Sequence, residues 1–226
     1  MLRLHARGTG ARDHYNEVTR PNFFMSRTFQ VRKVAEADFP SRFGHFRIYG
    51  FEGSEPGYPP EEAVALKMGN LSEPAPPLVR IHSQCLTGDV FHSLRCDCRA
   101  QLELALTSIA REGRGLLIYE NQEGRGIGLL NKLRAYELQD QGADTVEANE
   151  QLGFDADLRV YALAGPILKY FGLSSVRLIS NNPEKIQALA EAGIQVAERV
   201  PAVVTPVAST EDYLRTKRDK LGHLLD

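Results

Sequence analysis

The chain has 226 residues, 42% of them hydrophobic and 25% charged, an ordinary globular composition that excludes a disordered or fibrous chain. This length suits one sizeable hydrophobic core, or one core with a small appendage. The formal net charge of −2 gives no electrostatic reason to expect nucleic-acid or membrane binding, so a polyanionic ligand must be met by a local cluster of arginine and lysine.

The first 30 residues contain no apolar signal-peptide core and no sustained period. Nowhere does an apolar run approach the ~20 residues that a bilayer requires. Acidic residues near the start also argue against an arginine-rich targeting segment. We therefore expect residues 1–30 to form an N-terminal extension, disordered or locally docked, ahead of a single domain at 31–226 in a cytoplasmic protein.

The first half of this domain is predicted to be mostly β-structure, because short apolar runs alternate with turn-rich stretches. After residue 97 the pattern changes to amphipathic helices that end at glycine, separated by short strands. The predicted strands are 46–51, 63–68, 78–83, 115–120, 175–180 and 194–200, and the predicted helices are 98–113, 127–142, 157–172, 183–193 and 211–225.

Two features of this pattern indicate the fold. The strand at 175–180, the helix at 183–193 and the strand at 194–200 form a compact βαβ unit, which requires parallel strands. Pro166 is expected to kink or break the helix at 157–172. The predicted fold class is therefore α/β, with a mixed sheet and a βαβ unit in the C-terminal half.

The three cysteines of the chain, Cys85, Cys96 and Cys98, all lie within HSQCLTGDVFHSLRCDC. An odd number without a signal peptide disfavours a disulfide framework, and three thiolates in one loop suit zinc. The fourth ligand must then be histidine, carboxylate or water, and water is typical of catalytic zinc. Two alternatives stay open: a structural site completed by His82 or His92, and three buried cysteines without metal.

A glycine-rich segment, YENQEGRGIGLLNK, joins a predicted strand to a predicted helix. Its glycines would let the backbone approach a ligand, and the free N–H groups of the helix would favour an anion. Arg125 adds a forked donor suited to phosphate or a planar base. The alternative is an ordinary strand-to-helix connection with turn glycines. No Walker A pattern occurs, so a P-loop NTPase is disfavoured.

Two further segments carry charges suited to phosphate chemistry. SNNPEK places Lys185 in the first turn of a helix, against the helix dipole, and a bound phosphate would remove that conflict. GFDADLR places Asp155, Asp157 and Arg159 at a predicted helix start, where a carboxylate base would lie beside an arginine. The alternatives are a solvated lysine in the first segment and a helix cap in the second.

These segments, with TKRDKLGHLL near the C-terminus, together resemble GTP cyclohydrolase II, the first committed enzyme of riboflavin synthesis. The resemblance runs from about residue 31 to residue 225. It implies a homodimeric, monofunctional enzyme that hydrolyses GTP to 2,5-diamino-6-(5-phosphoribosylamino)pyrimidin-4(3H)-one, formate and pyrophosphate. It also implies one zinc per chain, held by three cysteines and water, and Mg²⁺ with the triphosphate.

The resemblance also implies roles for individual residues. Asp157 would accept a proton, Arg159 would act as nucleophile at the α-phosphorus or as an electrostatic stabiliser, and Tyr136 would assist the hydrolytic steps at the ring. The zinc ligands would be Cys85, Cys96 and Cys98. The GTP site would be lined by Arg80, Ile81, His82, Ser83, Gln84, Gln101, Glu123, Gly124, Arg125, Thr145, Ser180 and Lys185.

Three positions depart from the pattern expected of the family. Gln84 stands in place of glutamate, Asn121 in place of arginine and Ser180 in place of threonine. The first two changes remove charge near the ligand site. Two alternative functions follow: a specialised paralogue that stops at the formamidopyrimidine nucleotide or serves a secondary-metabolite pathway, and a non-catalytic nucleotide-binding protein with structural zinc.

Overall fold

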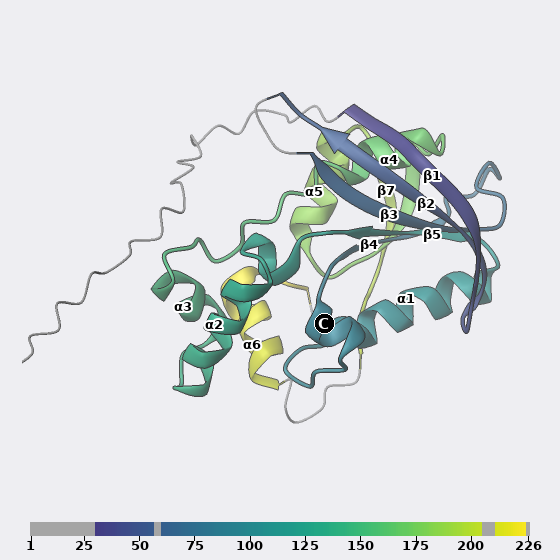
Figure 1. Cartoon of the computed structure of the whole chain (residues 1–226). Helices are drawn as coiled ribbons and strands as arrows, with labels where there is room; N and C mark the ends of the chain where they lie inside the picture. Colours follow the sequence, from purple (N-terminus) through teal and green to yellow (C-terminus); the bar gives the residue numbers. More distant parts are fainter. Residues whose placement is uncertain (1–29, 57–59, 205–210, 225–226) are drawn as a thin grey trace, which may run out of the picture.

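The computed structural model describes residues 30–56, 60–204 and 211–224, so nearly all of the expected N-terminal extension lies outside it. Within these ranges one seven-stranded mixed sheet runs in the order β1-β2-β3-β5-β4-β6-β7 (Figure 1). Its strands are β1 Gln30–Ser41, β2 Gly44–Ser54, β3 Glu61–Met68, β4 Leu78–Ser83, β5 Gly115–Glu120, β6 Ser175–Ile179 and β7 Gln195–Val200.

The sheet has an antiparallel half and a parallel half. Strands β1, β2, β3 and β5 pair antiparallel, whereas β4 pairs parallel to both β5 and β6, and β6 pairs parallel to β7. The predicted βαβ unit is confirmed as β6, α5 and β7. The α/β class with a mixed sheet is confirmed as well.

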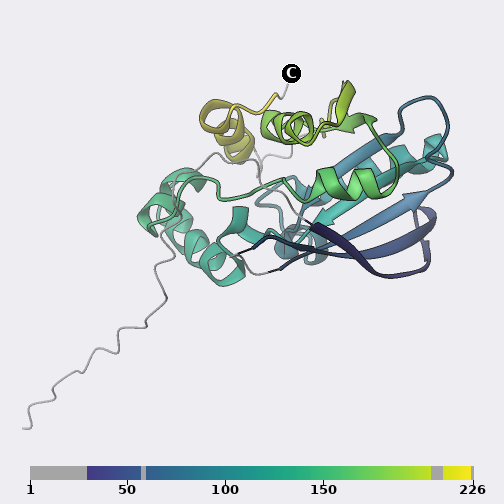
Figure 2. The ribbon, with the colours of Figure 1, turned by 90° about the horizontal axis from the view of Figure 1, so that it is seen from above.

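The helices are α1 Cys98–Glu112, α2 Leu129–Asp140, α3 Thr145–Gln151, α4 Ala164–Tyr170, α5 Pro183–Glu191 and α6 Glu211–Leu221. Successive side chains of β5 point to opposite faces of the sheet, and each face has its own hydrophobic core. Leu116 and Ile118 pack in the core that includes α4 and α5, and Leu117 packs in the core that includes α1. Helices α2, α3 and α6 gather beside the sheet, not on its faces (Figures 1 and 2).

Strand β1 and the helix around Pro166 differ from the sequence prediction. β1 was not predicted, because most of its residues are exposed at a sheet edge and show no apolar alternation. The helix predicted at 157–172 is wrong in its first half, since helix α4 begins only at Ala164. Pro166 lies in the first turn of α4, where its missing N–H costs no hydrogen bond, so it marks a helix start and not a kink.

Helix α3 was also not predicted. It is only seven residues long, too short to show a helical period, but a capping box defines its start. The Asp144 side chain accepts hydrogen bonds from the N–H groups of Val146 and Glu147, and the Glu147 side chain accepts one from the Asp144 N–H. This cap fixes the position of Thr145 at the edge of the site described below.

Close packing of α4 against the end of α5 makes a stability prediction. A Cβ added at Gly165 would collide with the Cβ of Ala192. Gly165→Ala should therefore lower the free energy of unfolding by about 1–3 kcal/mol, although alanine is the better helix former. Urea unfolding checks this, with the double variant Gly165→Ala/Ala192→Gly as control. The double variant should recover part of the loss, and a single variant as stable as the wild type would contradict the packing.

Candidate active site

The candidate site lies where the parallel strands end. Cys85 follows β4, Gln122 follows β5 and Ser180 follows β6. Because parallel strands place their carboxyl ends at one edge of a sheet, the three segments that follow them meet there. A short π-helical turn, Leu86–Val90, and a 3-10 turn, Glu123–Gly126, form the first connections beyond this edge.

The three cysteines converge as predicted. Their Sγ atoms lie within 4.8 Å of one another, and those of Cys85 and Cys96 are 3.7 Å apart. No disulfide joins them. A Cβ at Gly88 would lie 3.0 Å from the Sγ atoms of both Cys85 and Cys96, so only glycine leaves the thiol cluster this room. In the described part of the chain no histidine or carboxylate joins this group.

The carboxylate of Asp89 holds the first cysteine in place. It accepts hydrogen bonds from the Cys85 N–H at 3.1 Å and the Tyr119 hydroxyl at 2.8 Å, and pairs with His82 Nε2 at 3.1 Å. His82 is therefore turned to Asp89 and not to the thiols. Burial lowers the pKa of His82, which disfavours its charged form. His92 lies exposed beyond the turn. A site of three cysteines and one of these histidines does not fit this geometry.

Lys132, on α2, brings a positive charge to the thiols. Its Nζ lies 3.1 Å from Cys85 Sγ and 2.6 Å from Glu123 Oε1. Hydrogen bonds from Cys96 and Cys98, with the charge of Lys132, hold the pKa of Cys85 far below its usual range. Burial works against the charge on Lys132, but Glu123 and Cys85 outweigh it and raise its pKa. The cluster thus favours a thiolate, the form that binds metal.

Glu123 ties the two loops together. One of its carboxylate oxygens accepts the Leu86 N–H at 2.6 Å, and the other accepts from Lys132 and from the Gly124 N–H. The side chain is buried, so its negative charge is matched by Lys132 and two backbone donors. Glu123 was predicted to line the GTP site, and here it also fixes the cysteine loop against the glycine-rich loop.

The glycine-rich loop adopts a backbone that favours glycine. Gly124 has φ +62°, and Arg125 has φ +60°, which is uncommon for a residue with a side chain. The Arg125 carbonyl accepts the Leu158 N–H at 3.0 Å, and a Cβ at Gly126 would lie 3.1 Å from the Leu158 side chain. The loop is therefore clamped to the segment that carries Asp157 and Arg159, which is more than an ordinary connection requires.

Asp157 and Arg159 form a partly buried ion pair in an irregular segment. Arg159 donates from Nε and from its terminal nitrogen to both carboxylate oxygens, at 2.5–3.1 Å. The sequence placed this pair at a helix start, and that is wrong, so the capping alternative does not apply. Burial opposes both charges. Even so, each partner stabilises the other, and the pKa of Asp157 is lowered while that of Arg159 is raised.

A cleft opens above these loops, and many of the predicted residues line it. Those that do are Ser83, Gln84, Cys85, Cys96, Cys98, Glu123, Gly124, Arg125, Tyr136, Thr145 and Arg159. Tyr136 donates to or accepts from Thr87 Oγ1 at 3.0 Å, and the Arg95 guanidinium lies 4.7 Å from its ring centroid. The cleft therefore combines the thiols with a phenol and several cations.

Among the polar residues of the cleft that sequence reasoning missed are Arg95, Lys132 and Tyr213. Lys132 and Tyr136 are four residues apart on α2 and so share one helix face, a spacing that could have indicated Lys132. Tyr213 comes from α6, far away in the sequence. That helix is held by the buried ion pair of Lys217 with Asp97 at 2.7 Å, a contact that no local pattern reveals.

Other predicted residues do not line the cleft. Six of them are buried and Asp157 is half-buried; the six are Arg80, Ile81, His82, Gln101, Ser180 and Lys185. Arg80 donates to the Ile179 carbonyl at 2.9 Å and to Gln101 Oε1 at 2.6 Å. Lys185 donates to the Ile81 carbonyl at 2.8 Å and is only 5% exposed, so the solvated-lysine alternative is wrong.

Comparison with known proteins gives a consistent result. The family model described as GTP cyclohydrolase II matches residues 32–201, more than half of the chain. The chain is 55% identical over 197 residues to proteins named GTP cyclohydrolase-2 from Shigella boydii serotype 18 and Escherichia coli O9:H4. Each match spans 87% of this chain and 99% of the relative.

The chain belongs to the GTP cyclohydrolase II family.

Among solved structures, a two-domain 3,4-dihydroxy-2-butanone 4-phosphate synthase from A. baumannii, RibBX, is similar at a TM-score of 0.42 and 18% identity. The match covers 76% of this chain and 39% of that protein, a likeness too distant to support an argument. None of the described helices is long and apolar enough to cross a membrane, in agreement with the absence of a long apolar run in the sequence.

Three positions at which the chain departs from the expected GTP cyclohydrolase II pattern now have places in the structure. Gln84 lines the cleft next to Cys85. Asn121 lines a second pocket, which shares Gln122 with the cleft. Ser180 is buried, and its Oγ accepts the Asn182 N–H at 3.1 Å. Of the three, only Gln84 faces the thiol side of the site.

Proposed function

We propose that this chain hydrolyses GTP to 2,5-diamino-6-(5-phosphoribosylamino)pyrimidin-4(3H)-one, formate and pyrophosphate, using zinc, in riboflavin biosynthesis. One observation carries the proposal. A cluster of three thiols shares a cleft with Arg95, Arg125, Lys132 and Arg159. The thiol end of the cleft suits a metal that activates water for attack at a carbon of the purine ring, and the cations suit binding of a triphosphate. Relatives 55% identical to the chain carry the matching name.

The thiol cluster fits zinc in its chemistry and its spacing. Three cysteine sulfurs within 4.8 Å of one another can share one ion at Zn–S distances of ~2.3 Å. Hydrogen bonding by Asp89 and Lys132 orients Cys85 and favours its ionised form. When bound, zinc would act as a Lewis acid and activate water for attack at C8 of the purine. The chain supplies three ligands, which leaves a fourth position for water.

The cationic end of the cleft suits the triphosphate. Arg125 and Arg159 lie on two segments held together by a backbone hydrogen bond, so their relative position is fixed before substrate binds. Guanidinium groups bind phosphate with paired donors. We expect Mg²⁺ to accompany the triphosphate and to share the neutralisation of its charge.

Arg159 is better suited to stabilising charge than to acting as a nucleophile. Burial disfavours its charge, but Tyr161 and the ion pair with Asp157 outweigh burial and raise its pKa. A protonated guanidinium has no free lone pair for attack at phosphorus. We therefore assign Arg159 to charge stabilisation at the α-phosphate. Asp157, whose pKa the same pair lowers, is ionised at neutral pH and available as proton acceptor.

Tyr136 suits the later steps at the ring. It lines the cleft beside the thiols, and burial raises the pKa of its hydroxyl, which therefore stays protonated. A protonated phenol can donate a hydrogen bond to a developing charge on the opened imidazole. A homodimer, which the family resemblance implies, and a cytoplasmic location, which was expected from the N-terminal sequence, stay predictions.

Two alternative functions make different predictions at this site. A specialised paralogue would release pyrophosphate and accumulate the formamidopyrimidine nucleotide, and Gln84 beside Cys85 is the feature that favours it. A non-catalytic nucleotide-binding protein would release neither product. The retained cysteines, Tyr136, Asp157 and Arg159 argue against the second alternative.

Incubation with GTP and Mg²⁺ tests the proposal, with products identified by mass. Formate and pyrophosphate should appear in equal amounts together with the diaminopyrimidine. In Cys96→Ser, the zinc affinity and the rate of formate release should each fall at least ~100-fold, because one of three soft ligands is gone. Pyrophosphate release should fall less, since other groups hold the phosphates. Full ring opening by Cys96→Ser, or a formamide end product in the wild type, would contradict the proposal.

Arg159→Lys tests the role assigned to the ion pair. Lysine keeps the charge but cannot form the two-nitrogen contact with Asp157, so pyrophosphate and formate release should both fall by ~10²-fold or more. The matched control is Arg134→Lys, an exposed arginine on α2 whose bond is to Asn131, and it should retain the wild-type rate. Unchanged formate release by Arg159→Lys would rule out an early role in the reaction.

A further inference from the structure

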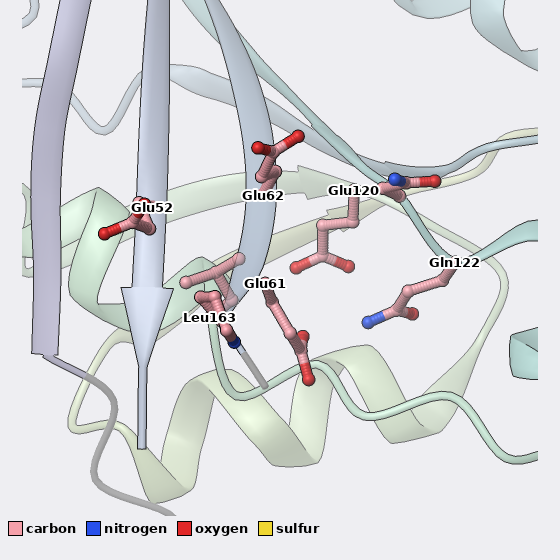
Figure 3. Close-up of a pocket in the computed structure, with 8 residues that line it drawn as sticks. Glu52, Glu61, Glu62, Glu120, Gln122 and Leu163 are labelled. Carbon is pink, nitrogen blue, oxygen red and sulfur yellow. The ribbon is translucent and has the colours of Figure 1, made fainter. Parts of the chain in front are cut away.

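The second pocket has a volume of about 230 Å³. Carboxylates dominate its walls, with Glu52 on β2, Glu61 and Glu62 on β3, and Glu120 at the end of β5 (Figure 3). Gln122 lines both this pocket and the cleft, so the two are neighbours. Neither the thiol centre nor the proposed phosphate contacts use these four carboxylates.

Glu120 is the most unusual residue of the pocket. It is 1% exposed, and within the described ranges neither of its carboxylate oxygens has a hydrogen-bond partner. Figure 3 shows the carboxylate pointing into the pocket, on the side of Glu61. A buried carboxylate without donors is costly, because its lost hydration is not replaced. Its position indicates that something in the pocket satisfies it.

Gln122 adds a third oxygen in the same situation. Its amide nitrogen donates to the Val160 carbonyl at 2.5 Å, which assigns the other amide atom as the oxygen. That oxygen is buried and has no partner among the described residues. In Figure 3 the side chains of Gln122 and Glu61 reach toward the same space from different elements. The pocket thus offers three buried oxygen acceptors, two from Glu120 and one from Gln122, that have no hydrogen-bond partner among the described residues.

We propose that this pocket binds a hard divalent cation of the Mg²⁺ class through Glu120 and Gln122, with Glu61 as a further carboxylate and water completing the shell. Mg²⁺ and similar ions prefer oxygen ligands and keep several waters, for which the pocket has room. The additional charge of Glu52 and Glu62 on the walls favours a cation over an anion. This site needs no nucleotide, unlike the Mg²⁺ that would accompany a triphosphate.

A proton is the competing occupant. Burial raises the pKa of Glu120 to about 8, and Glu61 adds to this, whereas Lys185 and Arg159 oppose it. An empty pocket would therefore hold a proton on Glu120 near neutral pH. A proton on Glu120 can engage at most two of the three unpartnered oxygens, as the donor atom and its acceptor, whereas a cation can bind all three. The cation would brace Gln122, the residue before the loop of Glu123 and Arg125.

Mn²⁺ serves as the probe, because its electron paramagnetic resonance signal reports free ion. Zinc-loaded, full-length protein without nucleotide should bind one Mn²⁺, and Mg²⁺ should displace it. Glu120→Gln should weaken that binding at least ~10-fold while the zinc content stays unchanged. Glu61→Gln should weaken it less, and it supplies a second variant if Glu120→Gln folds poorly.

Glu62→Gln is the matched control. It removes the same charge from the same pocket wall, but Figure 3 shows its carboxylate turned away from Glu120 and Gln122. Mn²⁺ affinity should change by less than ~3-fold in this variant, as expected for a distant charge alone. Equal weakening by Glu62→Gln and Glu120→Gln, or no Mn²⁺ binding by the wild type, would overturn the proposal and assign a proton to Glu120.

Discussion

The parallel pairing of β4 with β5 and β6 is the constraint on which the rest of the site depends. It brings the carboxyl ends of three strands to one edge, and each end leads into a different functional segment. The cysteine loop follows β4, the glycine-rich loop follows β5, and the segment with Ser180 and Lys185 follows β6. Residues almost one hundred positions apart meet as a result, as when Arg80 donates to the Ile179 carbonyl.

Buried charges then fix the loops at this edge. Asp89 ties the Cys85 backbone to His82 and Tyr119, and Glu123 ties the cysteine loop to Lys132. Each of these carboxylates has several donors, which offsets the cost of its burial. Glu120 differs from both because it has none among the described residues. We therefore assign a structural role to Asp89 and Glu123, and ligand binding to Glu120.

Local patterns predicted much of this arrangement. The cysteine window, the strands at 78–83 and 115–120 and the βαβ unit appeared in the structure as expected, because each depends on spacing within a few residues. Features that depend on contacts between distant parts of the sequence were not predicted. The segment from Asp157 to Leu163 looked helical but is irregular, with the Leu158 N–H bonded to the Arg125 carbonyl of the glycine-rich loop. Strand β1 lacks an apolar pattern because it is an exposed edge. The unpartnered oxygens of Glu120 and Gln122 depend on the whole pocket, which no local pattern encodes.

The proposed function requires the three thiols at this edge of the sheet to form a metal centre with an open position. X-ray absorption at the zinc edge, on protein purified without added metal, tests that claim most directly. We expect one zinc per chain with three sulfur ligands at ~2.3 Å and one oxygen ligand that changes when a non-hydrolysable GTP analogue is added. Absence of zinc, or a closed shell of three sulfurs and one imidazole that the analogue leaves unchanged, would contradict it.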